Sequence, residues 1–354
     1  VELLIATAIG MFLMSAIVQV FTQSQMTVSV NQSVNEMQDR GRSLLQHLGY
    51  HLAQRGHQGC LPPVALNIQD VPNIDWTHDY AARPVASSLP NRSHAELALR
   101  SYEVSAAGVF SPVPLDADIQ ALANGSLTIA PRPLSDVISV QYGDRRSVAI
   151  ANAMGNSNEV LTLAPNDLDL QVGELVMVGD CASLDIFTIT SVNNIGGAVE
   201  LGHSNASNRS GSFNKPYGTN AELRRLRVYT YFVGDSGRVA EQSQPIFSLY
   251  RLDGQGNVIE IGDGIDYLQA SYQVSTQAGL QNMTAASADF NSMQVTGVQL
   301  GLLVVGLKNV LLENDAKTYR LPSAVIGPAA TIPTPANRFL KTPFQTFVEI
   351  RNRA

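Results

Sequence analysis

Apolar residues follow one another through the N-terminal segment with almost no polar interruption. Residues 3–18 carry no charge, and Val20 and Phe21 extend the apolar run past Gln19. A helix of about 20 such residues crosses a hydrocarbon layer of roughly 30 Å. We therefore predict that residues 1–25 form a hydrophobic helix that can reside in a membrane.

A cleaved signal peptide is the main alternative for this segment. It requires basic residues before the apolar core and a small-residue cleavage site after it. The first charged residue here is the acid Glu2, and the next is Glu36. We therefore favour a retained segment. Glu2 lies either in the headgroup zone or in a paired site at membrane depth, where a carboxylate is costly; the sequence leaves both open.

The helical pattern continues beyond the apolar segment. Residues 26–59 contain no proline, and their apolar positions recur at spacings typical of one helix face. Gly56, Gly59 and Pro62-Pro63 end the pattern. We predict one helix of about 55 residues, roughly 80 Å long, whose second half is amphipathic. Its apolar face carries Val34, Met37, Gly41, Leu44, Leu48 and Leu52, and its polar face carries Gln32, Asn35, Asp39, Arg42, Gln46 and Gln54.

The remaining residues, 60–354, predict a β-rich globular body, with two sub-domains as an alternative to one. Short apolar runs, several with period-two alternation, are separated by Gly, Pro, Asn and Asp. Residues 234–237 and 253–257 have the composition of hairpin turns. The predicted fold class is α+β, a long helix packed on a mostly antiparallel β body. The predicted strands are residues 95–104, 127–129, 137–142, 160–163, 175–178, 186–192, 224–233, 247–252, 258–261, 267–274, 295–307 and 344–351.

Composition adds two restrictions. The formal net charge is −7, which provides no basic surface for nucleic acid. Charged residues are only 15% of the chain, and a polar but weakly charged surface agrees with a body outside the cytoplasm. Residues 204–218 and 322–337 are rich in Ser, Gly, Asn or Pro, so we predict exposed loops or a linker there.

The chain has two cysteines, Cys60 and Cys181. An even count on an outward-facing, membrane-anchored body indicates an oxidising compartment and a disulfide. The bridge would fasten the end of the helix to the β body, and closing a loop of about 120 residues is worth roughly 4–5 kcal/mol on the chain-entropy model. Two buried free thiols remain the alternative.

The N-terminal motif Val1-Glu2-Leu3-Leu4-Ile5-Ala6 resembles that of type IV pilins and type II secretion pseudopilins. In that family a basic leader ending in Gly precedes Phe-Thr-Leu-Val-Glu. Val1 therefore resembles the fourth mature position, and Glu2 resembles the family's single buried glutamate. The resemblance implies cleavage upstream of Val1 by a prepilin peptidase, followed by methylation of the new amine.

The resemblance also implies roles for residues of the apolar helix. Glu2 would pair with the N-terminal amine of an adjacent subunit and set the axial register of a filament. Packing among neighbouring helices would fall to Leu3, Leu4, Ile5, Ile9, Phe12 and Leu13.

Further motifs are similar to the large minor pilins called PilW. Gly41-Arg42 and residues 56–60 resemble the helix end of that group, and residues 180–187 resemble its second-cysteine motif. Other similar segments are residues 136–143, 248–251, 264–272 and 346–352, so the resemblance extends in patches over nearly the whole chain.

Motifs that suggest catalysis or metal binding are weak. Residues 234–237 read Gly-Asp-Ser-Gly, as in serine-protease nucleophile loops, but no base or orienting group accompanies them. His47 and His51 have a helical metal spacing without a third ligand. We predict no enzyme, no cofactor and no metal site. Asp253, Asn257 and Asp263 could bracket a calcium ion but lack the calcium-loop pattern. The arginines of residues 223–227 and Arg145-Arg146 could suggest an anionic ligand, but we assign them to strand faces and a turn.

The expected function is therefore structural. The resemblance implies a subunit of a type IV pilus, a PilW-like minor pilin that contributes to pilus assembly or the tip complex. Its partners would be other pilin subunits, the inner-membrane assembly platform and the prepilin peptidase. It would reside in the inner membrane as a single-pass protein and then in the extracellular filament. Alternatives are a minor pseudopilin of a type II secretion system, a tip adhesin that uses residues 204–218, and a main filament subunit.

Overall fold

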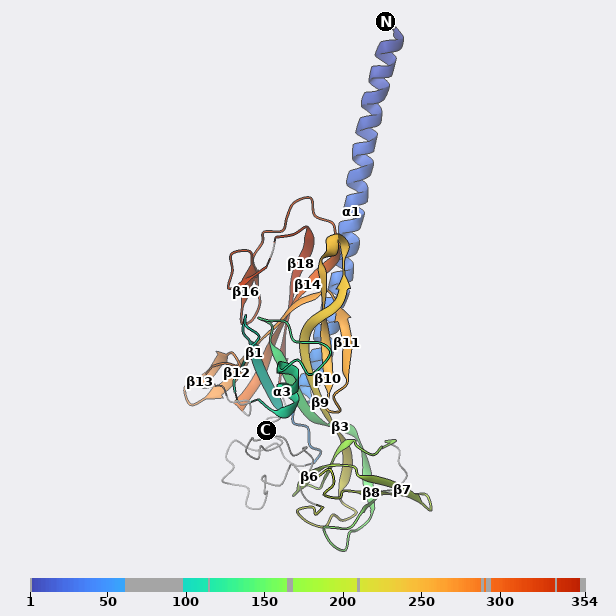
Figure 1. Ribbon diagram of the computed structural model, residues 1–354, viewed down its shortest axis with the longest axis vertical. Helices are drawn as coiled ribbons and strands as arrows, with labels where there is room; N and C mark the ends of the chain where they lie inside the picture. Colours follow the sequence, from blue (N-terminus) through green and yellow to red (C-terminus); the bar gives the residue numbers. More distant parts are fainter. Residues whose placement is uncertain are drawn as a thin grey trace.

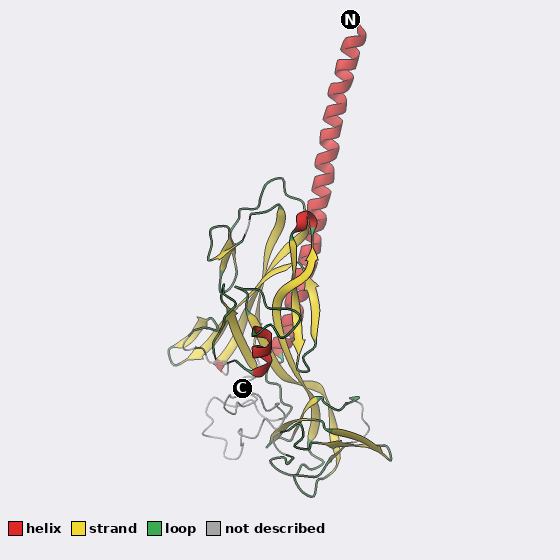
Figure 2. Cartoon of the chain, in the orientation of Figure 1, coloured by secondary structure: helices red, strands yellow, loops and turns green. Residues whose placement is uncertain are grey.

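The C-terminal half of a long helix packs against a β-rich body, and the N-terminal half of the same helix extends away from that body (Figures 1 and 2). The computed structural model describes residues 2–60, 98–113, 115–163, 168–208, 211–287, 290, 294–334 and 336–350, without the side chains of Glu2, Leu4 and Ala117. All strand pairs are antiparallel except β16 with β17. The predicted α+β class, with its long helix and antiparallel body, is confirmed.

Helix α1 (Glu2–Ala53) runs without a break through the predicted apolar and amphipathic halves. The predicted apolar face of the second half packs on the body: Met37, Leu48 and Leu52 are fully buried. The opposite polar positions are exposed. Gln54 is an exception, because it follows the helix end, is buried, and donates a hydrogen bond to the Tyr50 carbonyl oxygen at 3.2 Å.

The larger sheet has the order β11-β10-β9-β3-β4-β8-β7, and four further strands join it at its sides. Two strands, β3 and β9, are long enough to run through both ends of the body. The strands are β1 (Leu99–Val104), β2 (Phe110–Ser111), β3 (Val137–Asn152), β4 (Leu161–Leu163), β5 (Leu175–Gly179), β6 (Leu184–Thr188), β7 (Ser191–Ile195), β8 (Ala198–Gly202), β9 (Glu222–Val239), β10 (Pro245–Asp253) and β11 (Val258–Asp263).

A second sheet has the order β13-β12-β14-β18, and a small third sheet has the order β15-β16-β17. A short helix, α3 (Ala117–Ala123), and a 3-10 turn, η3 (Glu241–Ser243), lie in the connections. The strands of these two sheets are β12 (Ile265–Thr276), β13 (Gly279–Met283), β14 (Val295–Asn309), β15 (Tyr319–Arg320), β16 (Val325–Gly327), β17 (Ile332–Pro333) and β18 (Phe339–Glu349).

The largest hydrophobic core lies between α1 and the two main sheets. Leu48 of α1, Val140 of β3 and Leu300 of β14 are all fully buried in it. A second core occupies the end of the body opposite the free end of α1 (Figure 1). We call this part, the described residues of 148–223, the distal lobe. These two largest cores have separate residues and are linked by the continuous strands β3 and β9, and three smaller clusters lie beside them in the described residues.

Most predicted strands are present, with differences at their ends. Predicted residues 186–192 cover the end of β6 and the start of β7, which are separate strands. Residues 127–129 form no strand. The short strands β2, β8, β13, β15, β16 and β17 were not predicted, because runs of two to five residues carry little periodicity.

One of the two predicted hairpin turns is wrong. Residues 234–237 lie inside β9, where Gly234 pairs with Ser248 and Asp235 pairs with Phe247 of β10. The chain reverses later, at residues 240–244. The turn at residues 253–257 is confirmed, since the Asp253 carboxylate accepts hydrogen bonds from the backbone N–H groups of Gln255 and Asn257, both at 2.9 Å.

Both segments predicted as exposed loops contain core residues. In residues 204–218, Phe213 and Tyr217 are buried in the core of the distal lobe. In residues 322–337, Ile326 and Ile332 are buried under the third sheet. Their composition predicted irregular backbone correctly in the first segment, but single apolar side chains within such segments still fill the core.

The close approach of α1 to β18 depends on Gly41. A Cβ atom at this position would lie 2.6 Å from the Phe344 ring, whereas a Cβ atom at Gly10 would meet nothing within 4 Å. We expect Gly41→Ala to lower the free energy of unfolding by about 1–3 kcal/mol through overpacking, despite the higher helix propensity of Ala. Denaturant unfolding of the full chain in detergent measures this, with Gly10→Ala as the control. Equal stability of the two variants would contradict the packing role.

Candidate assembly surface

The first half of α1 has no contact partner within the body that covers its apolar side chains. We call residues 3–28 the apolar segment; all of its described side chains are exposed. The large apolar ones, including Phe12 at 79% and Met11 at 75% exposure, lie on every side of the helix. Since each such side chain gains about 1.5–3 kcal/mol on burial, the segment requires an apolar environment.

The residues predicted to pack against neighbouring subunits belong to this segment. Leu3, Ile5, Ile9, Phe12 and Leu13 are each more than half exposed. Glu2 lies in the first turn of α1, and its side chain and that of Leu4 are outside the described residues.

The apolar segment is compatible with a helix that spans a membrane. From Ile5 onward α1 is long and apolar enough to cross a bilayer, and none of the window that meets this criterion is buried inside the protein. A buried core helix is therefore excluded for the described chain. A membrane anchor and a signal sequence both satisfy the same criterion.

The apolar segment joins the body at a groove. A cavity of about 350 Å³ lies where α1 leaves the sheets, between Phe21 and Met26 on the helix and Lys308 and Val310 at the end of β14. The change from exposed to buried side chains takes place between residue 28, which is exposed, and Ser33, which is buried.

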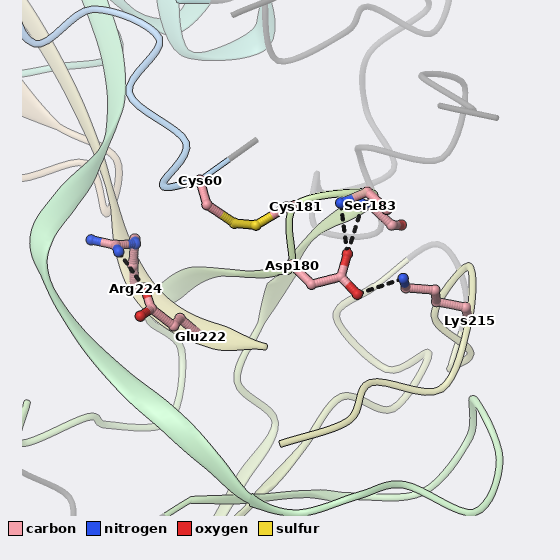
Figure 3. Close-up of a disulfide and its surroundings, with 8 residues drawn as sticks. Cys60, Asp180, Cys181, Ser183, Lys215, Glu222 and Arg224 are labelled. Carbon is pink, nitrogen blue, oxygen red and sulfur yellow. Dashed lines mark hydrogen bonds and ion pairs between the residues drawn. A yellow bond between two sulfur atoms is a disulfide. The ribbon is translucent and has the colours of Figure 1, made fainter. Parts of the chain in front are cut away.

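At its other end α1 is fastened to the distal lobe by the predicted disulfide. Cys60 and Cys181 are bonded, with their Cα atoms 5.0 Å apart (Figure 3). The alternative of two free thiols is therefore wrong. Because Cys181 follows β5 in the distal lobe, the bridge links the end of the helix to a packing centre that α1 itself does not enter.

The turn that carries Cys181 is held by Asp180. Its carboxylate accepts hydrogen bonds from the backbone N–H groups of Ala182 and Ser183, both at 2.9 Å, and from Lys215 Nζ at 2.6 Å (Figure 3). Burial opposes ionisation of this group, but the bonds from Lys215 and the backbone outweigh it and lower the pKa of Asp180. The cysteine is thus presented by a turn with an internal charge-assisted network.

His47 and His51 lie at the contact between α1 and the larger sheet. His51 Nδ1 is 2.5 Å from the Tyr142 hydroxyl, and His47 Nε2 is 3.2 Å from the Tyr231 hydroxyl. No group of three metal-ligating side chains exists among the described residues. The pair therefore acts in packing, at an interface within the chain.

Burial of His51 makes the helix contact sensitive to acid. Burial, together with the nearby positive charges of His47, Arg251 and Arg227, lowers the pKa of His51 to about 4. Because the unfolded histidine titrates near 6.5, the contribution of neutral His51 is complete above that pH and is lost as the pH falls toward 4. We expect the wild type to lose about 2–3 kcal/mol more stability than His51→Gln over this range. Denaturant unfolding at pH 7 and pH 4.5 tests this; parallel losses in both proteins would contradict it.

The residues weighed for catalysis and calcium binding have structural roles. Ser236 of the Gly-Asp-Ser-Gly segment donates a hydrogen bond to the Ile246 carbonyl oxygen at 2.6 Å. Asp253 and Asn257 bond to each other across their turn at 3.0 Å, while Asp263 lies 3.4 Å from Arg40 of α1. These groups hold turns and the helix contact.

The arginines noted in the sequence are mostly paired. Arg225 Nε lies 3.1 Å from Glu174 Oε2, and Arg227 Nη2 lies 2.9 Å from Asp144 Oδ2. Arg145 and Arg146 were predicted to lie in a turn; they lie in β3, where the register with β9 shifts between Gly143 and Ser147.

Neither a scan of protein-family models nor a search of the curated proteins finds a match to this chain. The observations that bear on function are therefore the N-terminal motif and the geometry of α1. The sequence analysis assigned the arginines of residues 223–227 to a strand face, and it did not place Arg251 and Tyr229 beside them around a cavity next to β9. No sequence signal marked it, because its members come from three separate strands and a turn.

Proposed function

We propose that this chain is a structural subunit of a type IV pilus, a minor pilin of the PilW-like kind. The observation that carries the proposal is a single helix with two different surfaces. The apolar segment is exposed all round, and the same helix continues to Ala53 with one face buried in the body. Such a helix can insert into lipid or pack among other helices while the body stays outside.

A retained segment is supported by its continuity with the fold. The helix contributes Met37, Leu48 and Leu52 to the main core and leads directly to Cys60. Because the apolar segment is the same rigid helix, movement of that segment moves the whole body. An assembly step that transfers the segment from lipid into a filament thereby positions the body on the filament surface.

The proposal includes the partners and location. Before assembly the apolar segment resides in the inner membrane, after processing by a prepilin peptidase. The assembly platform then transfers it to other pilin subunits in an extracellular filament. Glu2 pairs there with an N-terminal amine of an adjacent subunit, although a buried pair of this kind contributes more to register than to net stability.

The composition of purified filaments tests the proposal. Filaments sheared from cells that express the full chain should contain it at a low ratio to the main subunit, as measured by quantitative mass spectrometry. Its absence from filaments, with presence in a secretion complex, would favour the pseudopilin alternative. Recovery of a soluble chain cleaved after the apolar segment would contradict both.

Leu13→Asp supplies a matched variant for that experiment. Leu13 is 58% exposed and belongs to none of the hydrophobic cores of the described residues, so we expect the substitution to leave the body folded. A carboxylate near the middle of the segment costs about 2.5–3.5 kcal/mol on insertion. We expect the variant to be lost from the membrane and from filaments, while Gly10→Ala behaves as the wild type.

The tip-adhesin alternative requires a more careful test than deletion of residues 204–218. That deletion would remove Phe213 and Tyr217 from the core of the distal lobe. Substitution of the exposed Ser204, Asn205 and Ser207 by alanine leaves those residues in place.

A further inference from the structure

A break in the pairing of β9 creates a cavity on the larger sheet. Along one edge of β9, β5 pairs with residues 222–225 and β10 pairs with residues 229–239. None of the described strands pairs with residues 226–228 on this edge. The break lies where β9 passes from the main core into the distal lobe.

The cavity has a volume of about 200 Å³, and its lining is polar and charged. Arg225, Arg227 and Arg251 contribute three positive charges, and Glu174 and Asp253 contribute two negative charges. Asp144, the ion-pair partner of Arg227 next to the lining, adds a third negative charge, so the formal charges around the cavity balance. Pockets for drug-sized ligands are larger, about 300–1,000 Å³, so this one suits a small group.

Arg251 differs from the other two arginines of the lining. Arg225 is paired with Glu174, and Arg227 is paired with Asp144. The Asp253 carboxylate keeps its negative charge and accepts hydrogen bonds from the N–H groups of its own turn. Within the described part of the chain, no ion pair joins Arg251 to a carboxylate.

The guanidinium of Arg251 is held in place but not fully satisfied. Its Cζ atom lies 4.4 Å from the centre of the Tyr229 ring, a cation–π distance. Its Nε atom is buried without a hydrogen-bond acceptor among the described residues. The guanidinium also donates a hydrogen bond to the Tyr231 hydroxyl. A buried donor without a partner is costly, and an oxyanion that reaches Nε would lower that cost.

The charge of Arg251 also acts on α1. Burial first, and then the charge of Arg251, lowers the pKa of His47 and so favours its neutral form.

We propose that this cavity binds a small carboxylate, either a free acid or the acid group of a larger molecule, with Arg251 as its charged contact. A guanidinium offers parallel N–H donors that match the two oxygens of a carboxylate. The proposal is independent of the pilus function, because it depends only on residues of the body.

Titration of the full chain in detergent tests the site. The probes are acetate, glucuronate and inorganic phosphate at constant ionic strength, followed by calorimetry and by the thermal unfolding midpoint. We expect saturable binding of acetate, glucuronate or both, and about tenfold or greater weakening in Arg251→Gln. Arg238→Gln is the matched control, because Arg238 lies in the neighbouring strand β9, pairs with Glu260 and is absent from the lining.

The outcomes separate the sources of the carboxylate. Tighter binding of glucuronate than of acetate identifies a sugar acid, while equal binding identifies the acid group alone. If Arg251→Gln does not fold, Gly254→Met fills the cavity while keeping Arg251, because a Cβ atom there points at Val228 and Leu175 of the lining. The proposal is overturned if the wild type binds neither carboxylate, if phosphate binds more tightly than both, or if the folded cavity variant binds as the wild type does.

Discussion

Replacement of both Cys60 and Cys181 by serine is expected to lower the free energy of unfolding by about 4–5 kcal/mol. The bridge spans a sequence separation of 121 residues, so its removal frees a long loop in the unfolded chain. Domains of this kind are stable by only about 5–15 kcal/mol, so the loss is a large part of the total. Denaturant unfolding of the full chain in detergent measures the change.

Reduction of the wild type provides the control for this prediction. A reducing agent should produce the same loss in the wild type and no further change in the double variant. The distal lobe should lose hydrogen-exchange protection first, because the bridge is its covalent link to the end of α1. An unchanged unfolding midpoint in the double variant would show that the bridge adds nothing to stability.

Glu2→Ala is expected to abolish incorporation into filaments and to leave membrane insertion intact. Loss of the only charge before Glu36 makes the apolar segment more apolar, so insertion is not impaired. In a filament the amine that Glu2 would neutralise is left buried and uncompensated, which costs several kcal/mol. Membrane fractionation and mass spectrometry of sheared filaments report the two steps separately.

Glu36→Ala is the matched control on the same helix. Glu36 is half-exposed and lies 3.8 Å from Arg40, an i,i+4 pair of a kind that contributes only about 0.3–0.5 kcal/mol. This variant should enter filaments as the wild type does. Normal incorporation of Glu2→Ala would remove the register role and leave only the packing of apolar side chains.

The features predicted correctly are those that depend on local periodicity. A helix repeats every 3.6 residues, so the alternation of Met37, Leu44 and Leu48 with polar neighbours predicts which face is buried. The same residues are found in the main core. The absence of charged positions in residues 3–18 likewise predicts a segment that the body does not cover.

The features missed are those in which the surrounding structure overrides local composition. The Gly-Asp-Ser-Gly segment resembles a turn, yet β10 pairs with it and keeps it in β9. Phe213 and Tyr217 lie in a segment of loop composition, yet they enter the core of the distal lobe. A single apolar residue has no period, so only its neighbours in space determine whether it is buried.

The features at the two ends of α1 are therefore determined in different ways. The long helix and its exposed apolar segment follow from residues close together along the chain, because helix periodicity and apolar length are local properties. The bridge's position at the distal lobe, the break in β9 and the cavity around Arg251 depend on which strands lie beside one another. Those neighbours are set by contacts between residues far apart in the sequence, such as Tyr229 with Asp253 and Arg225 with Val176, and no local pattern encodes them.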